Sequence, residues 1–153
     1  MINKLAINNM DCALMAAKEA MQLGEVPVGA AIINYLDGSI VSFSGNRVEA
    51  DSDPTAHAEI LAIRKAAGIL NTPRLNMCDI YVTLEPCAMC AKAISLARLR
   101  RLYFGAEDPK GGAIYNGPKI FSHSGCNHYP EIYSGISEII SSRLLRDFFK
   151  LRR

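Results

Sequence analysis

Two short segments, 57–59 and 86–90, constrain this chain more than any other part of its sequence. Both combine metal-ligating side chains with the predicted start of a helix. The first follows Asp53 and Pro54, where an aspartate can cap a helix and a proline suits its first position. The second follows a predicted strand and has Pro86 at the opening of the next helix. We therefore expect a fold in which two helix N-termini can converge on one cation.

Three of these side chains have the chemistry and spacing of zinc ligands. Cys87 and Cys90 are three residues apart in the first turn of a predicted helix, so both sulfurs face one side. A helix N-terminus lowers the pKa of a thiol and favours the thiolate that zinc requires. With the imidazole of His57 the set offers three ligands, as in catalytic zinc sites, where a water takes the fourth position. The sequence predicts one Zn²⁺ bound by His57, Cys87 and Cys90.

Two other interpretations of the cysteine pair remain open at this point. A fourth ligand from His123, Cys126 or His128 would turn the site into a closed, structural zinc site. A Cys-x-x-Cys pair can also be a redox motif, although such a motif does not need a histidine and a glutamate beside it. The number of ligands that meet in space distinguishes the catalytic site from the structural one.

Glu59 is the candidate catalytic residue, but its position raises a geometric condition. Two helical residues correspond to a turn of about 200°, so Glu59 and His57 cannot share a face of a regular helix. Both reach one site only if that site lies at the mouth of the helix. If this condition is met, the Glu59 carboxylate can take a proton from a water at the zinc and deliver it to a nitrogen leaving group.

The remaining pattern alternates helices and strands along the whole chain. Apolar residues at helical or alternating spacing predict the elements, and Asp37-Gly38 is a hairpin turn signal. This order predicts one α/β domain spanning residues 1–153, a three-layer α/β/α sandwich with a five-stranded mixed sheet. The long, Gly- and Pro-rich loop 107–130 is expected to be functional. The predicted helices run through 10–21, 54–70, 87–99 and 137–153, and the predicted strands cover 28–34, 39–44, 79–84, 102–106 and 131–136.

The last predicted helix has an apolar side and two adjacent aromatic residues. Phe148 and Phe149 are neighbours, so they point in different directions on a helix. One of them is expected in the core and the other at the surface, where it can stack on a partner. The apolar residues expected on the inner side of this helix are Ile139, Ile140, Leu144, Leu145, Phe148 and Phe149.

Composition and cysteine usage indicate where this protein works. The chain is 50% hydrophobic and 21% charged, as in ordinary soluble domains. No apolar run approaches the roughly 18 residues of a membrane span, so no membrane partner is expected. Five cysteines form an odd number, and the N-terminal segment does not read as a secretion signal. We therefore expect a reduced, cytoplasmic protein.

The net charge of +2 is distributed unevenly. Residues 143–153 contain five basic residues and one acidic residue, and residues 92–110 contain five basic and two acidic. These segments carry +4 and +3, so the rest of the chain carries −5. This polarity suits a polyanion bound on one side, with Arg152 and Arg153 in contact with it. The alternative is a solvated helix end whose basic residues complement the helix dipole.

The motifs together resemble a known family. His-x-Glu followed by Pro-Cys-x-x-Cys is similar to the zinc-deaminase signature. From about Gly24 to Arg153 the chain resembles the bacterial tRNA-specific adenosine deaminases of the cytidine/deoxycytidylate deaminase superfamily. The segments that carry this resemblance are 24–30, 45–47, 53–60, 82–91, 104–106, 127–128 and 147–153.

This resemblance implies a specific activity and a set of site residues. The family converts the wobble adenosine of an arginine tRNA to inosine with release of ammonia. It acts as a homodimer that splays the bases of the tRNA anticodon loop into pockets. By resemblance, His57, Cys87 and Cys90 bind zinc and Glu59 shuttles protons. The implied substrate-binding residues are Asn46 at the base edge, Val28 and Ala58 in the base pocket, and Asp108 and Lys110 in the RNA-facing loop, to which the C-terminal helix adds Phe149, Arg152 and Arg153.

Two competing functions use the same scaffold. One is the deamination of free cytosine, guanine or nucleotides, against which the basic and aromatic C-terminal helix argues. The other is a zinc-stabilised RNA-binding module without activity, which four protein ligands on the metal would favour.

Overall fold

A five-stranded mixed sheet organises the chain in the computed structural model, which describes residues 4–152. The strand order is β2-β1-β3-β4-β5, with β1 antiparallel to β2 and β3, and β4 parallel to β3 and β5. The elements are α1 (Lys4–Gln22), β1 (Gly29–Asn34), β2 (Ile40–Gly45), α2 (Ala58–Leu70), β3 (Cys78–Leu84), α3 (Ala88–Leu96), β4 (Arg101–Ala106), η1 (Ile120–Ser122), β5 (Glu131–Tyr133) and α4 (Glu138–Leu151).

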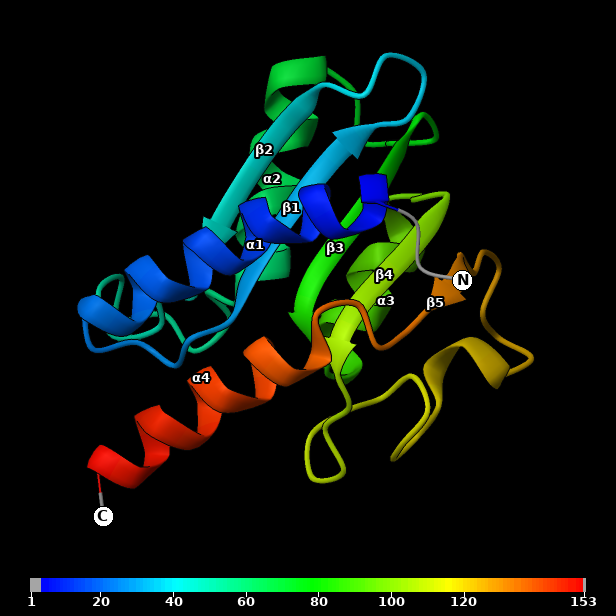
Figure 1. Ribbon diagram of the computed structural model, residues 1–153. Helices are drawn as coiled ribbons and strands as arrows, with labels where there is room; N and C mark the ends of the chain where they lie inside the picture. Colours follow the sequence, from blue (N-terminus) through cyan, green and yellow to red (C-terminus); the bar gives the residue numbers. More distant parts are fainter. Residues whose placement is uncertain (1–3, 153) are drawn as a thin grey trace.

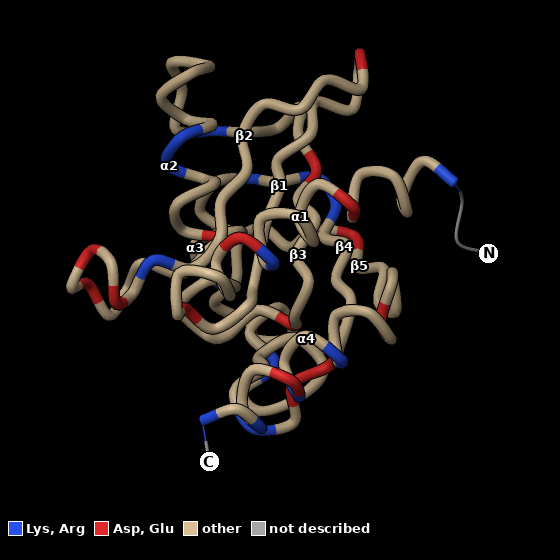
Figure 2. The backbone as a smooth tube through the Cα atoms, turned by 60° about the vertical axis from the view of Figure 1, so that its left-hand side comes forward, with Lys and Arg blue, Asp and Glu red and all other residues tan. Residues whose placement is uncertain are grey.

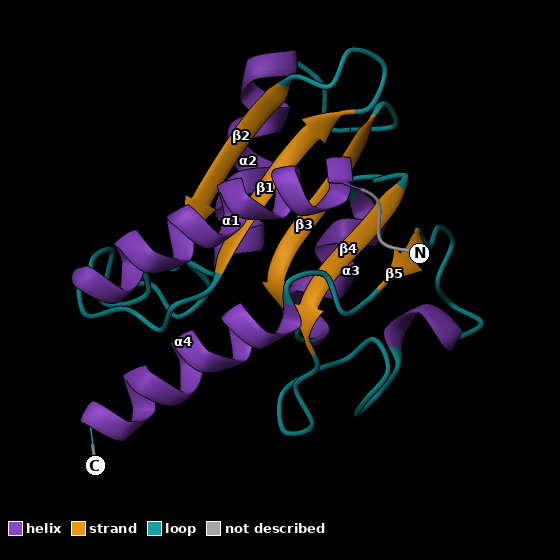
Figure 3. Ribbon diagram, in the orientation of Figure 1, coloured by secondary structure: helices purple, strands orange, loops and turns teal. Residues whose placement is uncertain are grey.

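Helices cover both faces of the sheet, which confirms the predicted three-layer fold (Figures 1 and 3). The strands β1 and β3 are buried almost throughout, because their successive side chains enter the two cores in alternation. Ile32 and Ile80 pack with α2 and α3 on one face. Ile33 and Tyr81 pack with α1 on the other. Nearly continuous apolar strands are expected where both faces of a sheet are covered.

Small residues allow α1 to lie very close to the sheet. Gly29 and Gly45 are paired in register on β1 and β2. A Cβ on Gly29 would collide with the carbonyl oxygen of Ala13 and lie 2.7 Å from the backbone nitrogen of Ala17. A Cβ on Gly45 would lie 2.6 Å from the carbonyl oxygen of Ala16. The backbone of α1 therefore packs directly on the two glycines.

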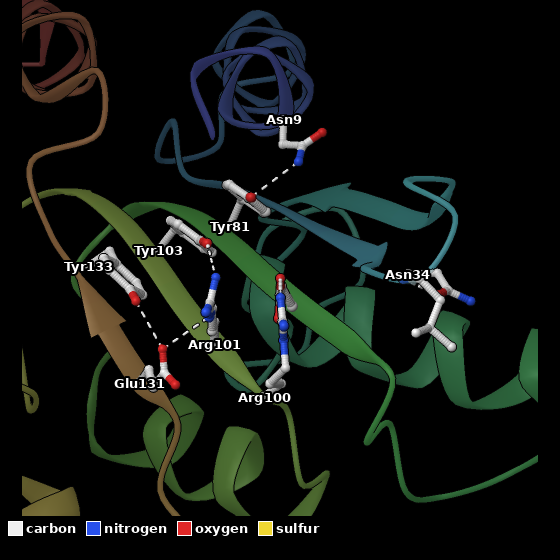
Figure 4. Close-up of polar contacts among 10 residues, drawn as sticks. Asn9, Asn34, Tyr81, Arg100, Arg101, Tyr103, Glu131 and Tyr133 are labelled. Atoms are coloured by element: carbon white, nitrogen blue, oxygen red, sulfur yellow. Dashed lines mark hydrogen bonds and ion pairs between the residues drawn. The ribbon is translucent and has the colours of Figure 1, made fainter. Parts of the chain in front are cut away.

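Stacked tyrosines connect the short strand β5 to the rest of the sheet (Figure 4). Tyr81, Tyr103 and Tyr133 are aligned across three strands, with ring centroids 4.3 Å and 5.0 Å apart. Beside them the Arg101 guanidinium forms an ion pair of 3.0 Å with Glu131 on β5. These contacts explain how a strand of three residues is retained, although the sequence predicted a strand of six.

The boundaries of two helices differ from the sequence prediction for a local reason. The helix predicted from Pro54 begins at Ala58, because the Asp53 carboxylate accepts hydrogen bonds from the Thr55 amide and hydroxyl and forms a separate turn. The helix predicted to reach residue 99 ends at Leu96. Arg98 follows in a left-handed conformation with a φ of 61°, which terminates the helix.

The prediction for the inner side of α4 was wrong at three positions. Ile139, Ile140 and Phe149 are 70%, 45% and 47% exposed, whereas Phe148 is only 6% exposed. The helix contacts the body of the protein along one narrow side, and its C-terminal part projects beyond the sheet (Figure 1). Despite these exposed apolar residues, neither α4 nor another helix within residues 4–152 is long and apolar enough to cross a membrane.

The close packing of α1 leads to a stability prediction. We expect Gly29→Ala to lower the free energy of unfolding by about 1–3 kcal/mol, because the new methyl group forces α1 off β1. Gly68→Ala in α2 is the matched control, since a Cβ there meets nothing within 4 Å. It should raise stability by roughly 0.5–1 kcal/mol, because alanine is the better helix former. Urea denaturation of both variants measures the difference, and equal stability would contradict the packing argument.

Candidate metal centre and active site

The N-termini of α2 and α3 meet at one point, and the potential metal ligands lie there. His57 is the N-cap residue of α2 and Cys87 is the N-cap residue of α3, both with extended backbone conformations. The Nδ1 atom of His57 is 3.6 Å from the Sγ atom of Cys87 and 3.6 Å from the Sγ atom of Cys90. The structure therefore brings together the three residues that the sequence singled out.

The spacing of these donor atoms fits a tetrahedral zinc ion. Zinc binds sulfur at about 2.3 Å and histidine nitrogen at about 2.0–2.1 Å, so tetrahedral angles place nitrogen and sulfur about 3.6 Å apart. Both distances from His57 have this value. Hydrogen bonding with Cys90, assisted by His57, lowers the pKa of the Cys87 thiol to about 4, while the same interaction and burial raise the pKa of Cys90. Two cysteine sulfurs and one imidazole nitrogen within 4.8 Å of one another form a donor set that suits Zn²⁺.

No fourth ligand joins this group within residues 4–152. His128 places Nε2 2.8 Å from the Leu99 carbonyl oxygen, and the Cys126 thiol donates to the carbonyl of His128 at 3.0 Å. The Nε2 atom of His123 lies 2.6 Å from the carbonyl oxygen of Pro118. The three candidate fourth ligands are thus engaged elsewhere, and the group keeps the open arrangement of a catalytic zinc site.

The geometric condition on Glu59 is met because His57 lies outside the regular helix. Glu59 is the second residue of α2, and its carboxyl group is at the helix mouth with only 4% of the residue exposed. Burial raises the pKa of this carboxyl. Glu59, His57 and Cys87 line one cavity of about 730 Å³, which we call the main cavity because two of the metal ligands lie in its wall. A carboxyl group beside the three metal ligands can therefore exchange protons with whatever occupies this main cavity.

Asn46 is held in a defined orientation at the wall of the main cavity. Its Oδ1 atom accepts a hydrogen bond of 2.9 Å from the backbone N–H of Ala58. Its Nδ2 group has no hydrogen-bond partner among residues 4–152 and is free to act as a donor. Val28 also lines the cavity, whereas the Ala58 side chain is fully buried in the core, so Ala58 contributes through its backbone.

A second cavity of about 1000 Å³ adjoins the first, between α4 and the loop after β4. Asp108 and Arg152 line both cavities, and Lys110 and Phe149 line the second. Arg152 donates to the Gly24 carbonyl at 3.1 Å, with its guanidinium 4.1 Å from the centre of the Phe148 ring.

Basic residues of α4 follow the helix to its end beside these cavities (Figure 2). The second cavity is lined by Lys110, Arg146, Lys150 and Arg152 together with Phe149, against Glu107 and Asp108, so the surface beside the main cavity is on balance basic and partly aromatic. Arg153 lies outside the described residues.

Two buried glutamates at the main cavity were missed by the sequence analysis. Glu25 accepts hydrogen bonds from the amides of Glu49 and Ala50 at 3.1 and 2.8 Å. Glu85 accepts five hydrogen bonds from the loop after β4. Burial acts to raise the pKa of Glu85, but these bonds outweigh it and lower the pKa. The one available signal was an acidic residue placed directly before Pro86.

An open three-ligand metal group beside a buried glutamate defines a zinc-dependent hydrolase. The sequence model of the cytidine and deoxycytidylate deaminase zinc-binding region matches residues 4–106. A tRNA-specific adenosine deaminase of Agrobacterium fabrum is 51% identical over 144 residues, which are 94% of this chain and 93% of that protein. The chain belongs to the cytidine and deoxycytidylate deaminase family and, within it, to the tRNA-specific adenosine deaminases.

Solved structures are similar over most of the chain. One comes from a study of A-to-I editing by tRNA:A34 deaminases and is 50% identical, with a TM-score of 0.87 over 90% of this chain and 99% of that one. A guanine deaminase from Bacillus subtilis is 38% identical, with a TM-score of 0.64 over 69% of this chain and 66% of that one. The mixed sheet and its helices are therefore those of the deaminase fold.

The ligand assignment predicts the zinc content of two cysteine variants. Cys90→Ala removes one of three ligands, so we expect loss of bound zinc and a lower melting temperature, because metal binding contributes to folding. Cys126→Ala is the control and should keep one zinc per chain, since Cys126 contacts Ser95 and His128 instead. Atomic absorption after gel filtration measures both. Loss of zinc from Cys126→Ala would restore the closed, four-ligand interpretation.

Proposed function

We propose that this protein converts the wobble adenosine in the anticodon of an arginine tRNA to inosine and releases ammonia. The observation that carries the proposal is the 51% identity to a tRNA-specific adenosine deaminase over 94% of the chain. The basic, aromatic surface beside the main cavity supports an RNA substrate. An anticodon-loop base can leave its stack and enter a cavity at low cost, whereas a base within a duplex cannot.

The proposed mechanism assigns proton transfer to Glu59. His57, Cys87 and Cys90 would hold the zinc ion, which when bound would supply the Lewis acidity that lowers the pKa of a water molecule toward neutrality. The Glu59 carboxylate takes one proton of that water and gives it to the ring nitrogen beside C6, while the hydroxyl adds to C6. Glu59 then carries the proton of this hydroxyl group to the 6-amino group. The C–N bond breaks and ammonia leaves. The buried position of Glu59 supports this role, because few competing waters reach its carboxyl.

We further propose that the protein is a single domain that acts as a homodimer in the cytoplasm. The family resemblance supports the dimer. Five free cysteines support a reducing compartment, since disulfides are rare there.

Deamination of a free base is the second candidate function. A guanine deaminase is 38% identical over 69% of this chain, and this similarity favours activity on a free base. The two candidates differ in whether activity requires RNA.

The first experiment measures inosine formation in an arginine tRNA with the zinc-loaded protein. We expect turnover of this tRNA, no turnover when its wobble base is guanosine, and no ammonia from free guanine, cytosine or adenosine. Glu59→Gln should keep its zinc and lose about 10²–10⁴-fold in kcat, the usual contribution of a positioned acid–base group. Glu138→Gln, at the start of α4, is the control and should stay active. Ammonia from free bases without tRNA turnover would establish the second candidate.

A second prediction tests the orientation of Asn46. Asn46→Asp keeps an oxygen acceptor for the Ala58 amide but replaces the free Nδ2 donor by a second acceptor. We expect kcat/KM for the tRNA to fall about tenfold to a hundredfold, the effect of one lost hydrogen bond in a buried site. Asn8→Asp on the exposed side of α1 adds the same charge and should have no effect. Unchanged kcat/KM in Asn46→Asp would remove Asn46 from the substrate site.

A further inference from the structure

One buried carboxylate holds the loop that forms a wall of both cavities. The Oε1 atom of Glu85 accepts hydrogen bonds from the Asp108 amide at 3.0 Å and from Nδ2 of Asn116 at 2.7 Å. Its Oε2 atom accepts from the amides of Ile114, Tyr115 and Asn116 at 3.0, 3.0 and 3.1 Å. Both ends of segment 108–116 are therefore bound to a single side chain.

The position of Glu85 connects this loop to the metal centre. Its backbone N–H continues the pairing of β3 with β4 by donating to Ala106 at 2.8 Å. The next residue, Pro86, accepts a hydrogen bond of 2.9 Å from the loop amide of Ala113. Cys87, a metal ligand, follows directly. Residues 85 and 86 thus bind the loop, and the residue that follows them is a metal ligand.

The loop is shaped closely around the carboxylate. A Cβ on Gly112 would lie 2.5 Å from Oε2 of Glu85 and 2.5 Å from the carbonyl oxygen of Asp108. The Asp108 carboxylate accepts from the amides of Lys110 and Gly111 at 3.1 and 3.0 Å, which closes the first turn of the loop. Asp108 and Gly111 then line both cavities. The shape of the cavity wall therefore depends on the hydrogen bonds to Glu85.

We propose that Glu85 is a positioning residue that sets the affinity for RNA by holding loop 108–116 against the cavity, without acting in the proton transfers. A carboxylate accepts hydrogen bonds at both oxygens, and five N–H groups converge on it here. Glutamine has the same shape but must turn its NH₂ group toward N–H donors on one side, which leaves buried donors unpaired. The expected effect on RNA affinity rests on the proposed function.

The test compares two buried carboxylates, one within β3 and one directly after it. Glu85 directly follows β3, and Asp79 lies near the start of β3, where it is 4% exposed and bound to Arg100 at 2.7 and 2.9 Å. Glu85→Gln should keep its zinc, raise KM for an anticodon stem-loop about tenfold or more, and change kcat less than twofold. Hydrogen exchange at the amides of segment 108–116 should become faster. Asp79→Asn should lower the melting temperature without changing KM or this exchange.

The outcomes separate the inference from a general loss of stability. An unchanged KM in Glu85→Gln, an equal rise of KM in Asp79→Asn, or loss of zinc with a fall in kcat would overturn it. If Glu85→Gln does not fold, Asn116→Ala removes only the 2.7 Å hydrogen bond to Oε1 and should raise KM in the same direction by a smaller factor. If the wild type is inactive on RNA, the proposed function fails. Independently of RNA, unchanged hydrogen exchange at the amides of segment 108–116 in Glu85→Gln would show that Glu85 does not hold this loop.

Discussion

The meeting of two helix N-termini at one point is the contact on which the site depends. His57 and Cys87 are 30 residues apart, and each is the N-cap residue of its helix. Both helices cover the same face of the sheet, so their N-termini can approach one cation. The positive ends of the helix dipoles stabilise thiolates there. A non-helical backbone at His57 is also what allows Glu59 to reach the same site.

The walls of the cavity depend on buried carboxylates whose hydrogen-bond partners are mostly backbone amides. Glu25 binds the amides of the segment after Asn46, and Glu85 binds the segment after β4. Buried carboxylates are stable only when their oxygens are hydrogen-bonded, and loop amides supply those bonds here. A rigid cavity benefits catalysis, because donors and acceptors that are already in place do not reorganise during the reaction.

Local patterns in the sequence predicted most of the elements and the chemistry of the metal group. The order of helices and strands, the ligand spacing of Cys87 and Cys90, and the five-stranded mixed sheet agree with the structure. The errors arise where two local signals compete. Asp53 closes a turn of its own instead of capping α2, and the apolar Ile139 and Ile140 stay exposed. Helical periodicity cannot tell how wide a contact the helix makes with the body of the protein.

The sequence by itself determined the ligand chemistry, because the spacing of two cysteines in one helical turn follows from the backbone geometry alone. It also determined the alternating order of helices and strands, because apolar periodicity is a local property of the chain. Only the tertiary structure decided that no fourth ligand joins within residues 4–152, that Phe148 and not Phe149 is buried, and that Glu85 holds loop 108–116. These features join residues far apart in the chain, so packing between elements sets them, and no periodic pattern along the sequence records that packing.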